Sequence, residues 1–265
     1  MFAAPPPLRL AVPAASIRPR PLHFAAPACH SRRVALPSLL QCRAQLRTAV
    51  LVSGGGRSLE NLLCHFTSST LVQICLVIAS REGCGAIERA RRFLVPVRVI
   101  SPRSPVDVRA FSEAVSAELD AQRVQLVVLA GFIHFYHIPD RYANRVMNIH
   151  PALMPSFCGR GYYGERVHRA VLAYGAKVTG VTVHFADNEY DHGPIILQRA
   201  VAVHEDDTVE TLAARVFAEE CRLLPQAIEL WATQRLRIEG RRVRILPAAE
   251  STHAPSSATT AMGDA

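Results

Sequence analysis

One lysine, one tryptophan and no long run of apolar residues mark this sequence of 265 residues. A membrane-spanning helix needs about 18 consecutive apolar residues, so we do not expect an integral membrane protein. Hydrophobic residues make up 49% of the chain and charged residues 20%, as in globular proteins, which excludes disorder throughout. None of the seven cysteines forms a Cys-x-x-Cys pair. We therefore expect reduced thiols, with Cys64 and Cys75 buried as small apolar residues, rather than disulfides or a zinc cluster.

Acidic residues are missing from the start of the chain, where the first one is Glu60. Residues 1–47 hold seven arginines and eight of the 18 prolines, so most of the formal net charge of +8 belongs to them. The remaining 48–265 have 23 basic and 22 acidic residues. An acid-free start with Arg, Ala and Ser but no long apolar core is typical of an organelle transit peptide. Its Pro and Ala content favours the chloroplast stroma, with the mitochondrion as the alternative destination and a basic tail that binds nucleic acid as the alternative role.

From residue 48 onward, apolar runs alternate with helical periodicity. A continuous β-branched run such as 72–79 (VQICLVIA) is typical of a strand buried on both faces. The order strand, helix, strand, helix, strand predicts an α/β fold with a doubly wound, mostly parallel sheet. The predicted strands are 48–52, 72–79, 95–100, 124–130, 146–149, 180–185 and 194–203, and the predicted helices end at about 66 or span 85–93, 106–123, 167–174 and 208–230.

Four segments follow from these patterns. Residues 1–47 are expected to be a disordered transit peptide, and 48–231 a single folded domain. A small hairpin is expected in a C-terminal extension, 232–247. The last segment, 248–265, is rich in Ala, Ser and Thr and has little potential to form a core, so we expect a disordered tail.

A glycine-rich turn, SGGGRS at 53–58, follows the first predicted strand and opens the first helix. Glycines let the backbone approach a ligand, and the free N–H groups of a helix N-terminus attract phosphate. The turn matches neither the P-loop nor the G-x-G-x-x-G pattern, so ATP and dinucleotides are not favoured. A tight turn that only needs glycine is the alternative. Arg57 and Ser58 add a cation and a hydroxyl, which favours a phosphate site.

Asn148 and His150 stand two residues apart at the end of a predicted strand, so their side chains point to the same side. An amide donor and an imidazole in one cavity supply what acyl transfer needs, an oxyanion donor and an acid or base. A structural histidine is the alternative. His150, His184 and His192 are too scattered along the sequence to indicate a metal site.

Asp191 lies in the turn DHGP before a later strand. A solvent-exposed turn aspartate is the plain alternative. If the turn folds back over the sheet, Asp191 can pair with His150 and raise its pKa, because a nearby negative charge favours the imidazolium.

Five segments together carry a resemblance to a known family: 53–59 (SGGGRSL), 129–132 (LAGF), 148–156 (NIHPALMPS), 183–185 (VHF) and 191–198 (DHGPIILQ). In this order they resemble the glycinamide ribonucleotide formyltransferases of the folate-dependent formyltransferase family, over about 48–231. The resemblance implies a single-domain, Rossmann-like formyltransferase fold. It also implies transfer of the formyl group from 10-formyltetrahydrofolate to the amino group of glycinamide ribonucleotide in de novo purine (IMP) biosynthesis. The products are N-formylglycinamide ribonucleotide and tetrahydrofolate. A 10-formyltetrahydrofolate hydrolase, in which water replaces the amine, is the alternative.

The resemblance also assigns roles to individual residues. Asn148 hydrogen-bonds the formyl oxygen, His150 donates a proton, and Asp191 keeps His150 protonated. The substrate-binding residues are Gly54, Gly55, Gly56, Arg57, Ser58 and Glu220. The folate-binding residues are Arg109 and Asn148, together with Ile133, His134, Phe135 and Tyr136, which act largely through backbone groups. Arg57-Ser58 replaces the Ser-Asn that the family usually has.

The partners implied by this reading are small molecules only: glycinamide ribonucleotide and 10-formyltetrahydrofolate as co-substrate. No metal is expected, because the formyl group is already activated on the folate. Neither nucleic acid nor a membrane is expected as a partner of the near-neutral domain, and the chain is expected to be a monomer or a homodimer.

Overall fold

The computed structural model describes residues 45–103 and 105–248. The predicted transit segment 1–47 and tail 248–265 therefore lie outside the described residues, apart from 45–47 and 248. The first strand begins at Leu46, two residues before the predicted start of the domain. In the described part of the chain, no helix is both long and apolar enough to cross a membrane.

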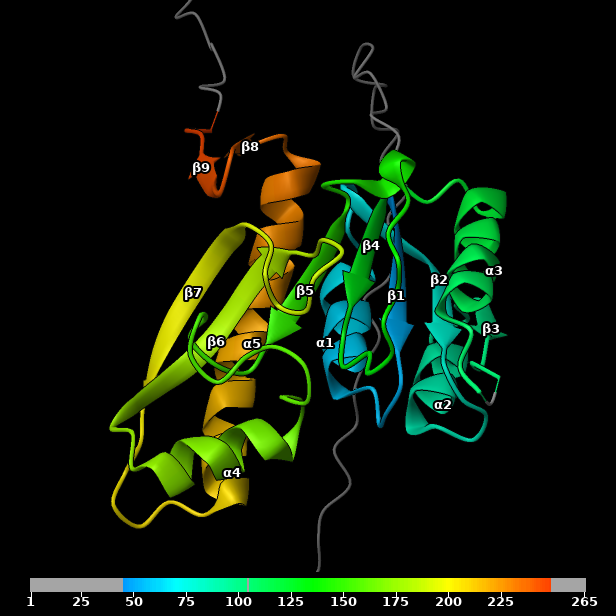
Figure 1. The fold of residues 1–265 in the computed structure, drawn as a ribbon. Coiled ribbons are helices and arrows are strands. Elements are labelled where there is room, and N and C mark those ends of the chain that lie inside the picture. Colours follow the sequence, from blue (N-terminus) through cyan, green and yellow to red (C-terminus); the bar gives the residue numbers. More distant parts are fainter. Residues whose placement is uncertain (1–44, 104, 249–265) are drawn as a thin grey trace, which may run out of the picture. The chain divides into compact units, whose positions relative to one another are not determined.

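Strands and helices alternate along the described residues (Figure 1). The elements are β1 (Leu46–Val52), α1 (Arg57–Phe66), β2 (Val72–Ala79), α2 (Gly85–Arg92), β3 (Val97–Val99), α3 (Val108–Ala121), β4 (Leu126–Leu129), a 3-10 turn (Asp140–Tyr142), β5 (Val146–His150), α4 (Glu165–Tyr174), β6 (Val178–Phe185), β7 (Ile195–Ala202), α5 (Val209–Ala232), β8 (Leu236–Glu239) and β9 (Arg242–Ile245).

The strands form one mixed sheet in the order β3-β2-β1-β4-β5-β6-β7-β9-β8. The strands from β3 to β5 in this order are parallel, which confirms the predicted doubly wound α/β arrangement. β6 runs antiparallel to both β5 and β7. Because β5 and β6 are antiparallel neighbours, Asn148 lies directly opposite His184.

The sheet is buried on both faces because its strands alternate between two apolar layers. In β1, Val50 and Val52 pack with α1 and α5 in one layer. Ala49 and Leu51 pack with α3 in the other layer. A continuous apolar run is therefore what β1 requires, as the sequence predicts.

The exposure of the two cysteines named above differs. Cys75 is buried in β2, as predicted. The prediction for Cys64 is wrong, because its side chain is exposed on α1. α1 buries only one of its faces, with Leu59, Leu62, Leu63 and Phe66, and Cys64 lies outside that stripe.

The predicted C-terminal hairpin is present as β8 and β9, which pair with each other in antiparallel fashion. β9 lies between β7 and the edge strand β8, and its Arg242 pairs with Ile195 of β7. The hairpin therefore lies close to the end of the loop that enters β7 from β6. α5 precedes the hairpin in the chain, and a capping box formed by Thr208 and Thr211 lies at the N-terminus of this helix.

Candidate active site

The glycine-rich loop lies at the carboxyl end of β1, where ligands of parallel α/β sheets bind. Gly56 has a left-handed backbone with φ 77° and ψ 31°. A Cβ at Gly56 would lie 2.7 Å from the Cα of Ala86 in α2. At Gly54 and Gly55 the space for a Cβ is open. The tight turn thus requires glycine at 56, whereas Gly54 and Gly55 leave room for a ligand.

Ser53 links this loop to the loop that follows β4. Its hydroxyl accepts hydrogen bonds from Ser80 Oγ (2.7 Å) and from the backbone N–H of Ile133 (3.1 Å). Its own N–H donates to the carbonyl oxygen of Gly131 over 3.1 Å. The two loops at the ends of β1 and β4 are therefore held as one rigid rim.

A cavity of about 560 Å³ opens beside the glycine-rich loop. The guanidinium of Arg57 lies over the Phe217 ring, 4.3 Å from its centroid. Ser58 Oγ donates to Glu220 Oε2 over 3.4 Å. Burial raises the pKa of Glu220 to about 7, against the opposing effects of the Ser58 hydrogen bond and the Arg57 charge. The lining includes all six predicted substrate-binding residues: Gly54, Gly55, Gly56, Arg57, Ser58 and Glu220.

His168 lines the same cavity and was not singled out from the sequence. It lies in the first turns of α4 and is 5% exposed. Its Nδ1 is one of the buried side-chain atoms that lack a hydrogen-bond partner in the described residues. Burial, with smaller contributions from the charges of His150 and Arg57, lowers its pKa. Its only sequence signal is its place in the helix that follows a glycine-rich segment at 157–164 (FCGRGYYG), which alone indicates no ligand.

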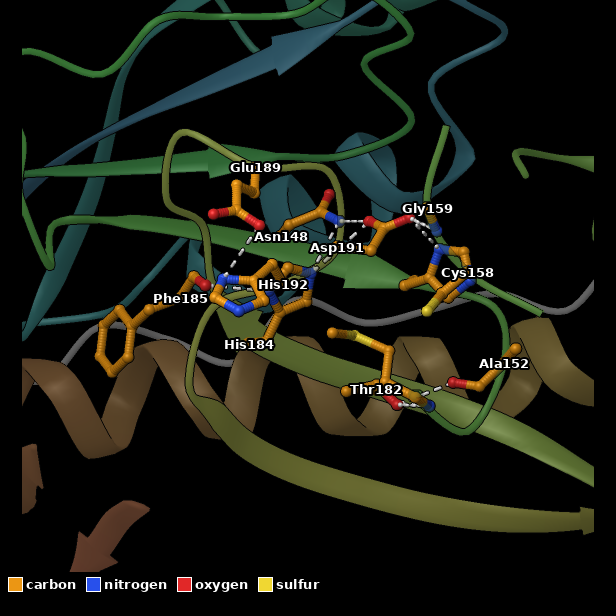
Figure 2. A network of polar contacts seen from close by, with 12 residues as sticks. Asn148, Ala152, Cys158, Gly159, Thr182, His184, Phe185, Glu189, Asp191 and His192 are labelled. Carbon is orange, nitrogen blue, oxygen red and sulfur yellow. Dashed lines mark hydrogen bonds and ion pairs between the residues drawn. The ribbon is translucent and has the colours of Figure 1, made fainter. Parts of the chain in front are cut away.

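Asn148 and His150 lie in β5, and Asp191 lies in the loop between β6 and β7. Figure 2 shows the Asn148 side chain directed at Asp191. Asn148 Nδ2 donates to Asp191 Oδ1 over 3.1 Å. His150 Nδ1 lies 3.5 Å from Asp191 Oδ2. The turn has folded back over the sheet, so the structure brings the three predicted catalytic residues together.

The conformation of the Asp191 turn results from close packing. Asp191 has a positive φ of 48°, which aspartate tolerates better than most residues. A Cβ at Gly193 would overlap the carbonyl oxygen of Phe185 at the end of β6. The backbone N–H of Gly159 donates to Asp191 Oδ2 over 2.8 Å. These contacts fix the carboxylate between β5 and the 157–159 segment.

Burial raises the pKa of Asp191, but opposing contacts leave it below the ordinary value. The opposing contacts are His184, the positive charge on His150 and the N–H of Gly159. Asp191 is therefore a carboxylate at neutral pH.

His150 is almost fully buried, and its exposure is 2%. Its Nε2 lies 2.9 Å from the carbonyl oxygen of Phe157, which only accepts, so Nε2 carries a proton. Burial lowers the pKa of His150 and outweighs Asp191 and the Phe157 carbonyl, which both raise it. Asp191 thus acts in the predicted direction, but the net pKa lies below the ordinary histidine value.

His184 is a further member of this cluster. Its Nε2 lies 3.0 Å from Asn148 Nδ2, and its Nδ1 lies 2.9 Å from the carbonyl oxygen of Phe185. The carbonyl fixes the proton on Nδ1, so in the neutral ring Nε2 accepts from the Asn148 amide. Sequence spacing did not reveal this role, because it depends on the antiparallel register of β5 and β6.

A second cavity, of about 410 Å³, lies against the three catalytic candidates. Asn148, His150 and Asp191 line it together with Ile133 and Tyr190. Both cavities are lined by four residues in common, Gly131, Ile149, Pro151 and Gly164. The site therefore consists of two adjoining spaces, and the polar cluster lies in the wall of the second.

The sequence model of the formyl transferase family matches residues 46–228 of this chain. The chain belongs to the formyl transferase family.

Relatives within this family share the whole folded domain. The chloroplastic phosphoribosylglycinamide formyltransferase of Arabidopsis thaliana is 37% identical over 196 residues, which are 72% of this chain and 67% of the relative. The trifunctional purine biosynthetic protein adenosine-3 of Gallus gallus is 36% identical over 214 residues, which are 78% of this chain and 21% of that protein. The crystal structure of glycinamide ribonucleotide transformylase 1 from Symbiobacterium toebii is 42% identical, with a TM-score of 0.72, and the match covers 80% of this chain and 99% of that one.

These relatives differ in length. The chain matches about a fifth of the chicken protein and about two thirds of the plant protein. It matches nearly all of the bacterial chain. The shared part is thus the formyl transferase domain itself.

In this formyl transferase, the side chains of the residues predicted to bind folate have different environments. Ile133 lines the second cavity, and Phe135 packs against the ring of Tyr190, which lines it too, with 5.0 Å between ring centroids. His134 lies instead against the rings of Phe111 and Phe132, and burial lowers its pKa.

Two of the predicted folate residues lie away from both cavities. Tyr136 is buried against α3, where its hydroxyl contacts Ser116 Oγ over 2.9 Å, and burial raises its pKa to about 12. Arg109 is exposed on α3 and pairs with Glu113 over 2.9 Å. It lines a separate hollow of about 860 Å³ that also contains His137. The structure therefore does not bring the Tyr136 and Arg109 side chains to Asn148.

In the described ranges, no group of three or more His, Cys, Asp or Glu side chains is arranged to hold a metal ion. His150 and His184 both direct their ring nitrogens to carbonyls and to the Asn148–Asp191 pair. These contacts suit the cluster to hydrogen bonding and proton transfer.

Proposed function

We propose that this chain transfers the formyl group of 10-formyltetrahydrofolate to the amino group of glycinamide ribonucleotide, giving N-formylglycinamide ribonucleotide and tetrahydrofolate for purine biosynthesis. The observation that carries the proposal is the Asn148–His150–Asp191 cluster in the wall of the second of two adjoining cavities. Two substrates need two adjoining spaces, and the reacting atoms must meet beside an oxyanion donor and a proton carrier.

The ribonucleotide takes the first cavity in this proposal. Its phosphate meets the N-terminus of α1, where free backbone N–H groups and the helix dipole favour an anion. Arg57, oriented by the face of Phe217, supplies a cation at the same place. Glu220, which lines the same cavity and accepts from Ser58, offers an acceptor to the hydroxyl groups of a ribose.

The formyl folate takes the second cavity. Its apolar wall, with Ile133 and Tyr190, suits a flat aromatic ring system, and the backbone of 131–133 offers donors and acceptors. We place the contribution of Phe135 in its support of Tyr190. Arg109 and His134 are proposed as more distant contacts, since neither lines this cavity.

The reaction itself requires one bond to form and one to break. The amine nitrogen of the ribonucleotide bonds to the formyl carbon, negative charge develops on the formyl oxygen, and the bond from that carbon to N10 of the folate then breaks. Asn148 donates one of its two amide hydrogens to the oxygen, and this bond replaces or shares a contact that the amide makes with His184 or Asp191 in the described structure. His150, with Asp191, carries the proton that leaves the amine to N10.

We propose the chloroplast stroma as the location. The Arabidopsis relative is described as chloroplastic. The acid-free, Arg- and Pro-containing composition of residues 1–47 supports a transit peptide. Import of the full chain into isolated chloroplasts, with shortening of the imported product, tests this; import into mitochondria alone contradicts it.

The test of the activity uses the purified full chain with 10-formyltetrahydrofolate, with and without glycinamide ribonucleotide. Formation of tetrahydrofolate that depends on the ribonucleotide supports the proposal. Formate release at the same rate without the ribonucleotide identifies a hydrolase instead, because water then replaces the amine. Binding of the ribonucleotide with neither product contradicts both enzymatic functions.

A further inference from the structure

The C-terminal hairpin makes a specific contact with the loop that carries Asp191. Arg241, in the turn between β8 and β9, directs its guanidinium at His192. Arg241 Nη1 lies 2.8 Å from His192 Nε2, and Arg241 Nη2 donates to the carbonyl oxygen of His192 over 2.7 Å. Two parallel hydrogen bonds from one guanidinium fix both the position and the orientation of the residue next to Asp191.

The chemistry of these groups determines where the proton of His192 lies. Arginine has no acceptor, so His192 Nε2 must accept from Arg241. The proton of the ring is then on Nδ1, which lies 2.8 Å from Asp187 Oδ2. His192 thus connects the Arg241 cation with the Asp187 carboxylate, and both ends of the connection are charge-assisted hydrogen bonds.

The other end of the loop is attached separately. Asn188 Oδ1 accepts from the N–H of Ile138 over 2.7 Å, and Asn188 Nδ2 donates to the carbonyl oxygen of Ile138 over 3.1 Å. Along the chain, Asp191 lies between Asn188, which makes this attachment, and His192, which makes the other one. The carboxylate therefore sits in a segment that is fixed on both sides.

We propose that Arg241 is a positioning residue that acts through His192 to hold the Asp191 carboxylate against His150 and Asn148. The inference deepens the proposed function and rests on it for its catalytic consequence. The family match ends at residue 228, so the hairpin that supplies Arg241 lies beyond it. The turn of this hairpin reaches the catalytic loop.

Loss of the contact has a different signature from loss of substrate binding. The glycine-rich loop, Arg57 and Glu220 lie around the other cavity and do not touch the hairpin turn. Removing Arg241 therefore leaves the KM for the ribonucleotide unchanged. The carboxylate of Asp191 becomes less well placed, and its effect on the pKa of His150 is reduced.

The experiment compares the full chain with Arg241→Ala, His192→Ala and the double variant. We expect kcat of Arg241→Ala to fall between about three- and thirtyfold with unchanged KM for the ribonucleotide. If Arg241 acts through His192, the double variant is no slower than the slower single variant. Arg241→Lys, which cannot make both bonds in parallel, is expected to restore only part of the rate.

Arg244→Ala is the matched control, because Arg244 lies in the same hairpin and pairs with Glu239 rather than with the loop. It is expected to keep the wild-type kcat. Wild-type kcat in Arg241→Ala, or losses that add fully with those of His192→Ala, overturn the proposal. Equal losses in Arg241→Ala and Arg244→Ala also overturn it, since they indicate a general effect of the hairpin.

A second readout does not depend on activity. Titration of the His150 ring by NMR is expected to give a lower pKa in Arg241→Ala than in the wild type. The reason is that Asp191 raises the pKa of His150, and this effect weakens when Asp191 is less well placed. An unchanged titration contradicts the positioning role. If the wild-type chain transfers no formyl group but the titration shifts as expected, the proposed function fails and the positioning role stands.

Discussion

The side-chain amide of Asn148 donates to Asp191 Oδ1 over 3.1 Å while its nitrogen also lies 3.0 Å from His184 Nε2. Both amide hydrogens therefore have an acceptor, and rotating the amide by 180° would direct its oxygen at a carboxylate. The orientation of the amide is thus fixed before any ligand binds. Because the amide has only two hydrogens, donation to the formyl oxygen must replace or share one of these two contacts.

Asp191→Asn removes the negative charge that faces His150 and is expected to lower kcat by about ten- to a hundredfold. Because Asp191 raises the pKa of His150, its loss lowers that pKa further. The limb of the kcat–pH profile that reports the ionisation of His150 therefore moves to lower pH. A profile that keeps its wild-type rate and position contradicts the assigned role of Asp191.

Glu220→Gln tests the raised pKa of the buried carboxyl in the first cavity. The pKa of Glu220 is about 7 in the folded chain against an ordinary 4.5. A carboxyl with a raised folded-state pKa contributes stability at low pH that is lost as the pH rises through the folded value. Between pH 5 and 8 the wild type should therefore lose on the order of 1 to 3 kcal/mol relative to Glu220→Gln. Urea denaturation of both proteins at several pH values measures this, and parallel curves contradict it.

Gly56→Ala is expected to destabilise the chain by about 2 to 4 kcal/mol, because alanine disfavours a left-handed backbone and its Cβ would overlap Ala86. Gly54→Ala is the matched control in the same loop, since nothing lies within 4 Å of its Cβ position. It is expected to change stability by less than about 1 kcal/mol. Equal urea midpoints for the two variants would show that the turn does not constrain Gly56.

Tyr136→Phe distinguishes a core residue from a folate contact. Its hydroxyl contacts only buried Ser116 among the described residues, so the variant is expected to lose about 1 kcal/mol of stability and to keep its KM for 10-formyltetrahydrofolate. Ile133→Ala, which shortens a half-exposed side chain in the second cavity, should do the opposite. A raised KM in Tyr136→Phe with unchanged stability would show instead that the Tyr136 hydroxyl contacts the folate.

Much of the fold is readable from local patterns. The apolar run of β2 predicts burial on both faces, and Thr208 predicts the start of α5, because both depend on neighbours in the chain. The pairing of Asn148 with His184 does not follow from such patterns, because it depends on β6 running antiparallel to β5. A register between distant strands has no local signal.

The candidate site divides in the same way. The family motifs identify Asn148, His150 and Asp191, and the structure brings these side chains together. They do not show that Tyr136 points to the core, because it lies in the irregular segment after β4, where side-chain directions follow no simple period. The net pKa of His150 could not be derived either, because it is set by burial, which sequence spacing does not reveal.

The most direct test of the account is a single-turnover assay of the full chain and of His150→Ala, with saturating 10-formyltetrahydrofolate and glycinamide ribonucleotide. The wild type is expected to form one equivalent of N-formylglycinamide ribonucleotide per tetrahydrofolate. In His150→Ala the rate is expected to be lower by about a hundredfold or more, with the fold and ribonucleotide binding retained. Formyl transfer at the wild-type rate in His150→Ala, or no transfer by the folded wild-type chain, would contradict it.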